Sequence, residues 1–200
     1  ALERRAWTDA ARLEVLPAST PYTQAMTHFA RALGLARSGQ PAAVTAEIEA
    51  MSALQAKMTE LKDPYWTEQI SIQRRVAEAW RLFAMGQRDE GIAALRAAAD
   101  AEDATDKAAV TPGPLAPARE LLGFMLLEAG RARDAVAAFE ATAQKEPNRF
   151  LGLYGLATAA TAAGDTARAR STFARLLEVA KKGDATRPEL AEARRALAWR

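Results

Sequence analysis

One histidine and no cysteine limit the metal and nucleophile chemistry that this chain can carry. His28, in the segment QAMTHFARALG, is the single histidine among 200 residues, and cysteine is absent. A zinc site would therefore need several carboxylates beside His28, because such sites are built from converging Cys, His and acidic ligands. The absence of cysteine also excludes disulfides and thiolate nucleophiles. A lone histidine at a helical packing position is more often structural, so we predict no metal and no cofactor.

The serines lack the surroundings of a catalytic nucleophile. None stands in a G-x-S-x-G elbow, and a single histidine could activate only one of them. The phosphate-binding patterns of nucleotide enzymes, the P-loop and G-x-G-x-x-G, are also missing. We therefore predict that the protein is not an enzyme.

Acidic residues are most concentrated at Asp100, Glu102, Asp103 and Asp106, which Lys107 follows. Their spacing does not match an EF-hand loop, and the lysine would oppose a cation. A solvated helix end explains the cluster, and so does a local network with Arg119. The other interpretation is a small-ligand or metal site near residues 28, 65–69 and 100–107. Its candidate residues are His28, Tyr65, Trp66, Gln69, Glu102 and Asp103.

Charge and hydropathy exclude two classes of partner. Lysine and arginine number 27 and acidic residues 25, which leaves a formal charge of +2. This excess is too small for a nucleic-acid surface by charge alone. No apolar run approaches the roughly 20 residues that span a bilayer, so we predict no membrane insertion within this chain. The composition fits a cytoplasmic or a periplasmic protein, and any targeting signal would lie upstream.

Helical periodicity runs through the whole sequence. It predicts helices at 1–15, 21–37, 41–62, 64–85, 88–102, 115–129, 132–145, 148–163, 166–182 and 188–199. Very short turns join these helices in pairs, and four turns contain a glycine: Gly39, Gly86, Gly130 and Gly164. Glycine can take the left-handed conformation that ends a helix, so each marks the corner of a helical hairpin.

The hairpins repeat one sequence pattern. Five residues after a corner glycine stands a small residue, as at Ala135 and Ala169. Nine residues after it stands a large one, as at Phe139 and Phe173, and seven residues before it another small one, as at Gly123. Small residues let two helices approach closely, and the large residue on the same face fills the space between them.

This pattern resembles the tetratricopeptide repeat, a helical hairpin of thirty-four residues. The match rests on Gly123, Ala135-x-x-x-Phe139 and Pro147, then on Ala157 and Ala169-x-x-x-Phe173. Lys181 replaces the closing proline, and Arg119 and Leu126 replace aromatics usual in the first helix. The resemblance implies an all-α fold, a right-handed α-solenoid of helical hairpins with a C-terminal capping helix.

The period divides the chain into one solenoid of several units. Residues 115–147 and 148–181 are standard repeats, 21–62 and 64–110 are long and divergent, and 187–200 form the capping helix. Pro112, Pro114 and Pro117 interrupt any helix in the connector before residue 118. Aligning LERRAWTDA with LEAGRARDA places Arg5 on a corner glycine, so residues 1–17 read as half a repeat. We expect the chain to be the C-terminal part of a longer bacterial tetratricopeptide repeat protein.

In this family the first helices line a concave face, and the resemblance assigns side chains of this chain to it. They are Met26, Phe29, Leu33 and Ala36; Gln73, Val76, Trp80 and Phe83; Pro117, Glu120, Phe124 and Leu127; Leu151, Tyr154, Thr158 and Thr161. The predicted partner-binding groove comprises Phe29, Gln73, Val76, Trp80, Phe83, Glu120, Phe124, Leu127, Tyr154 and Thr158. The basic and amide residues that clamp a chaperone carboxylate in some members are missing. Alternatively, the long repeats fold over these positions and make Trp80 and Phe83 core residues.

Two functions follow. The first is a non-catalytic scaffold that binds a helix or peptide of another protein in this apolar, aromatic groove, or that packs against upstream repeats of its own chain. The second is a small-ligand or metal-binding solenoid that uses the site around His28, Tyr65 and Glu102. No nucleic-acid partner is expected in either case.

Overall fold

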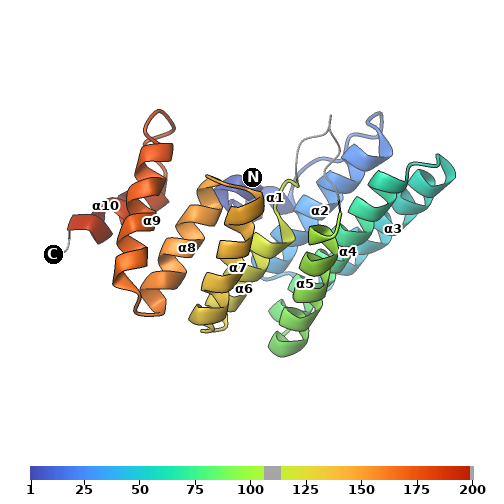
Figure 1. Ribbon diagram of the computed structural model, residues 1–200. Helices are drawn as coiled ribbons and strands as arrows, with labels where there is room; N and C mark the ends of the chain where they lie inside the picture. Colours follow the sequence, from blue (N-terminus) through green and yellow to red (C-terminus); the bar gives the residue numbers. More distant parts are fainter. Residues whose placement is uncertain (106–113, 199–200) are drawn as a thin grey trace. The chain divides into compact units, whose positions relative to one another are not determined.

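The computed structural model describes residues 1–105 and 114–198, and Figure 1 shows them as successive helices. No strand occurs among these residues, which confirms the predicted all-α repeat fold. The helices are α1 (Trp7–Ala11), α2 (Pro21–Arg37), α3 (Val44–Glu60), α4 (Pro64–Ala84), α5 (Arg88–Asp103), α6 (Ala118–Glu128), α7 (Ala132–Lys145), α8 (Phe150–Ala162), α9 (Thr166–Val179) and α10 (Pro188–Ala198). Short 3₁₀ turns occupy Leu2–Arg4 and Pro41–Ala43.

The chain forms two compact units, Ala1–Ala118 and Arg119–Arg200, here called unit 1 and unit 2. In unit 1, α2 packs against α1, α3 and α4, and α4 packs against α3 and α5. In unit 2, α8 packs against α7 and α9, and α10 packs against α9. Each unit thus has a layer of first helices, such as α2 and α4, and a layer of second helices, such as α3 and α5.

The predicted corners have the conformation expected of them. Gly39, Gly86, Gly130 and Gly164 have φ of 83°, 90°, 75° and 80°. Arg5, aligned with these glycines by sequence, has φ of 53° although it is not a glycine. Arg5 thus shares the left-handed backbone geometry that ends a helix at these glycines.

The predicted helix over 1–15 is wrong, because that segment is mostly irregular. It consists of the Leu2–Arg4 turn, the left-handed Arg5 and the five residues of α1, and no helix covers residues 12–20. A left-handed residue ends a right-handed helix, and Pro17 disfavours helical backbone at Leu16. The side-chain amide of Gln24 donates to the carbonyls of Pro17 and Ser19, which fixes the segment before α2.

Small residues bring the helices into contact as the pattern predicts. The Phe139 ring of α7 lies against Gly123 of α6 and Gly155 of α8, where an added Cβ would stand 2.6 and 2.3 Å from the ring. In unit 1, a Cβ on Gly34 would stand 2.3 Å from the backbone of Ala11, so α1 lies directly on α2. A side chain at any of these glycines would push the neighbouring element away.

Unit 2 ends with α10 packed on the preceding hairpin. Its Leu190 and Ala193 are buried with Leu153, Phe173 and Leu176 of α8 and α9. The C-terminal helix therefore covers the apolar side that the last hairpin would otherwise expose. In the part of the chain that the structure describes, no helix is both long enough and apolar enough to cross a membrane.

Candidate functional site

Aromatic side chains meet where α2 and α4 begin. The rings of Tyr22 and Trp66 stack in parallel, with centroids 4.4 Å apart and an interplanar angle of 10°. Tyr65 contacts Trp66 edge-on, with centroids 5.2 Å apart. All three side chains are half-buried, so this cluster, here called the aromatic platform, keeps part of its surface open to solvent.

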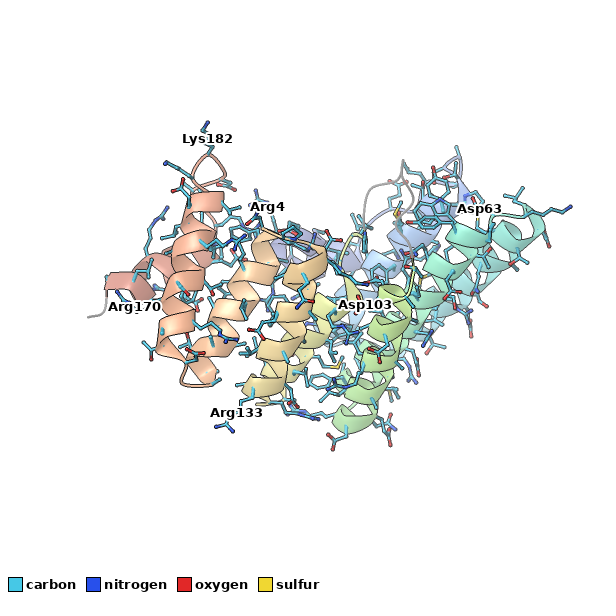
Figure 2. All side chains as sticks on the ribbon, in the orientation of Figure 1. Arg4, Asp63, Asp103, Arg133, Arg170 and Lys182 are labelled. Atoms are coloured by element: carbon cyan, nitrogen blue, oxygen red, sulfur yellow. The ribbon has the colours of Figure 1, made fainter. Side chains whose placement is uncertain are left out.

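The helix starts themselves hold the platform in place. Pro21 and Pro64 each occupy the first position of their helix, where a missing N–H costs nothing and the fixed φ suits a helix. The carboxylate of Asp63 accepts from the backbone N–H of Trp66 at 3.0 Å and caps α4. Figure 2 labels Asp63 at this end of unit 1. Trp66 therefore projects from a capped first turn.

His28 belongs to a different cluster. Glu47 of α3, 6% exposed, accepts from His28 Nδ1 at 2.7 Å. The other Glu47 oxygen lies 2.8 Å from Arg31 Nη2, and Arg31 Nη1 donates to the carbonyl of Leu13 at 3.1 Å. One buried carboxylate thus joins α2 to α3, and Arg31 extends this network to the segment after α1. The geometry gives His28 a structural partner.

Gln69, Glu102 and Asp103 lie around the end of α5. Gln69 Nε2 donates to Thr105 Oγ1 at 3.4 Å, and Glu102 Oε2 accepts from the backbone N–H of Ala118 at 2.7 Å. Asp103 lies at the C-terminal end of α5, as Figure 2 shows. These contacts fix the ends of helices, and none of them reaches His28.

Of the residues predicted for the alternative ligand site, His28 contacts Glu47, Tyr65 and Trp66 belong to the platform, and Gln69 and Glu102 contact residues next to the end of α5. Among residues 1–105 and 114–198, no group of three or more His, Asp or Glu side chains could hold a metal ion. The predicted cluster members Asp106 and Lys107, like Pro112 of the connector, lie outside the described residues.

In unit 1 the middle of the first-helix layer is closed. Phe29, Val76, Trp80 and Phe83 are 2%, 1%, 2% and 7% exposed. The Arg37 guanidinium lies 4.6 Å from the Trp80 ring centroid and 5.4 Å from that of Trp7, so it lies between α1 and α4. Gln73 is half-buried, and its side-chain oxygen has no hydrogen-bond partner among the described residues.

In unit 2 three of the predicted groove residues contact other side chains of the same unit. Glu120, 1% exposed, accepts from Arg149 Nε at 2.9 Å. Phe124 is 9% exposed and meets the Phe139 ring edge-on, with centroids 5.0 Å apart. The hydroxyl of Tyr154 donates to Glu192 of α10 at 2.8 Å, while Leu127 and Thr158 are half-buried.

Comparison with known proteins identifies the repeat. Residues 126–197 match the family described as Tetratricopeptide repeat. This part of the chain carries the tetratricopeptide repeat. No curated protein and no solved structure matches the chain. Tetratricopeptide repeats generally serve as protein–protein interaction modules.

Four residues of the predicted groove are buried in unit 1. Phe29, Val76, Trp80 and Phe83 stand at concave positions of the tetratricopeptide repeat, but they are core residues here. The cause is local, because α1 and the Arg37 side chain cover Trp80. Trp80 and Phe83 are therefore buried within unit 1.

Sequence reasoning missed Tyr22, which the repeat period does not mark. It lies seven residues before Phe29, and Trp66 lies seven residues before Gln73, so each is two helical turns from a predicted groove residue. Both belong to the extra N-terminal turns that make α2 and α4 longer than a standard first helix. Following the predicted helix face two turns upstream would have found them.

Proposed function

We propose that this tetratricopeptide repeat chain is a non-catalytic interaction module that holds a peptide or helix of a partner protein against its first-helix layer. The family assignment supports binding as the general role. In unit 1 we expect the partner to contact the part of this layer that is accessible to solvent. That part is the aromatic platform, because the middle of the layer is filled by its own side chains.

The observation that carries this proposal is the stacked pair of Tyr22 and Trp66. Half-buried aromatic rings on an ordered helix turn lose little side-chain entropy on binding, and tryptophan and tyrosine are enriched at binding hot spots. The flat outer surface of the platform suits a proline or aromatic side chain of the partner. An extended peptide with such a residue, or an amphipathic helix that presents one, therefore fits the surface best.

Peptide selection tests the assignment. Peptides would be selected on the immobilised protein from a displayed library of random sequences, and their affinities measured by fluorescence anisotropy. We expect Trp66→Ala to weaken binding about tenfold or more, as for a hot-spot side chain, and Tyr22→Ala to weaken it less. Met85→Ala, which removes an exposed apolar side chain at the opposite end of α4, is the matched control.

The variants need a fold control because both rings are partly buried. Helical circular dichroism and the melting temperature should change little in Trp66→Ala. If every selected peptide binds Trp66→Ala and Tyr22→Ala as tightly as the wild type, the platform is not the binding surface.

A further inference from the structure

Unit 1 has a second concave surface on its second-helix side. A groove with a volume of about 400 Å³ runs between α3 and α5, with α4 as its base. Ile48, Ala94 and Ala97 line its apolar part, and Ser71, Arg74, Arg75 and Glu78 line its polar part. This groove does not include the aromatic platform.

Two guanidinium groups in the groove lack an anionic partner. Arg75 Nη2 donates to the backbone carbonyl of Ala97 at 3.0 Å, and Arg74 Nη1 donates to the amide oxygen of Gln55 at 2.6 Å. Neither arginine forms an ion pair within residues 1–105 and 114–198. In addition, the Nε of Arg74 is buried there without a hydrogen-bond partner. The neutral contacts orient both cations and leave their charge uncompensated.

The acidic residue of the groove is already neutralised. Glu78 receives two hydrogen bonds from Arg81, Nε to Oε2 and Nη2 to Oε1, both 2.7 Å long. The hydrogen bond to Glu78 raises the pKa of Arg81, so the guanidinium stays charged. With Glu78 satisfied, the groove presents the charges of Arg74 and Arg75 beside an apolar lining.

The corresponding groove of unit 2 differs in chemistry. It lies between α7 and α9 on α8, has a volume of about 260 Å³, and its lining includes Leu153, Leu156 and Arg175. The Arg175 guanidinium donates to the amide oxygen of Asn148. Counted from the corner glycines Gly86 and Gly164, Arg75 corresponds to Leu153 and Glu78 to Leu156. Leucines at these positions pack between the helices, as Leu153 does at 6% exposed, whereas Arg75 is exposed. Both grooves thus contain an arginine, and unit 1 has a second one, Arg75, where unit 2 has Leu153.

We propose that this groove binds an acidic segment of a protein partner. One carboxylate of the segment pairs with Arg74 and Arg75, which offer charge-assisted hydrogen bonds to an anion. A neighbouring apolar side chain of the segment rests on Ile48, Ala94 and Ala97. This surface goes beyond the proposed function, because it lies on the second-helix side and uses none of the platform residues.

A defined peptide pair tests the proposal on the whole chain. The probe is a fluorescein-labelled peptide of alternating glutamate and leucine, and its companion has glutamine in place of glutamate. Anisotropy should show that the wild type binds the glutamate peptide about tenfold or more tightly than the glutamine peptide. Arg75→Glu should remove most of this preference, and Arg74→Ala should reduce it.

Arg96→Glu is the matched control, since Arg96 is an exposed arginine of α5 outside the groove lining and its replacement changes the net charge equally. We expect its affinity for the glutamate peptide to stay within about twofold of the wild type. Three results would each overturn the proposal: no binding by the wild type, equal binding of the two peptides, or equal losses in Arg75→Glu and Arg96→Glu. Trp66→Ala should bind this probe normally, which separates the groove from the platform.

Discussion

The buried carboxylate of Glu47 holds several residues of unit 1 together. It is 6% exposed and contacts both His28 and Arg31, and Arg31 in turn holds the Leu13 carbonyl. A buried charge without its partners is costly, so loss of one member leaves the others unsatisfied. The three residues therefore act as one network that fixes the segment before α2 and the α2–α3 hairpin together.

Replacement of Glu47 by alanine should lower the free energy of unfolding of the chain by about 2 kcal/mol or more. The reason is that Arg31 and His28 would lose their shared acceptor in a largely desolvated place. Chemical denaturation followed by circular dichroism measures the change. Glu49→Ala, an exposed carboxylate two residues further along α3, should change stability by less than about 0.5 kcal/mol. Equal effects of the two substitutions would mean that the network contributes nothing.

At the scale of the elements, the corner between α3 and α4 has a lysine where four other corners have a glycine. Lys62 lies there with φ of 57°, in the left-handed region, and its side chain is exposed. A non-glycine residue pays a steric cost of about 1 kcal/mol in that conformation. Glycine avoids this cost at a corner but weakens the interior of a helix.

Replacement by glycine should therefore change the stability of the protein in opposite directions at Lys57 and Lys62. Lys62→Gly should leave stability unchanged or raise it by up to about 1 kcal/mol, because the left-handed strain is removed. Lys57→Gly, within α3 and also exposed, should lower it by about 1 kcal/mol. Denaturant midpoints of the two variants measure the difference, and a stability loss at both sites would contradict the assignment of Lys62 to a strained corner.

Some features of the helices can be predicted from the sequence, and others cannot. Corner glycines and the small–large spacing predict the hairpins and the packing of Phe139 on Gly123, because both depend on residues a few turns apart. The pairing of His28 with Glu47 and the stacking of Tyr22 on Trp66 depend instead on the rotation and offset of whole helices. No periodic pattern encodes these quantities. The burial of Trp80 could not be predicted for the same reason, since Arg37, which lies against its ring, is far away in the sequence.

At the scale of the whole molecule, each unit contains its own core. In unit 2 the core joins α8, α9 and α10 through Phe173, Leu176 and Leu190, and α6 and α7 contact each other at Phe124 and Phe139. A unit with its own buried contacts can fold as one cooperative body.

Residues 114–200, expressed alone, should therefore fold. We expect a helical circular-dichroism spectrum and a single cooperative thermal transition. Phe173→Ala should lower the free energy of unfolding of this fragment by about 3 kcal/mol or more, because Phe173 is 2% exposed and its loss leaves a cavity. A fragment that is helical but melts without cooperativity, or a Phe173→Ala variant of unchanged stability, would contradict this view of unit 2.

The position of Arg37 between Trp7 and Trp80 also gives the protein an optical signal of its own. Trp7, Trp66 and Trp80 all belong to unit 1, and the fourth tryptophan, Trp199, is close to the end of the sequence. In a Trp199→Phe protein the indole emission thus comes from unit 1 alone. Trp80 reports the closed interior around the guanidinium and Trp66 the solvent-facing platform. Tryptophan fluorescence of one sample can then follow both the loss of tertiary packing and the binding of a partner to the platform, without an attached dye.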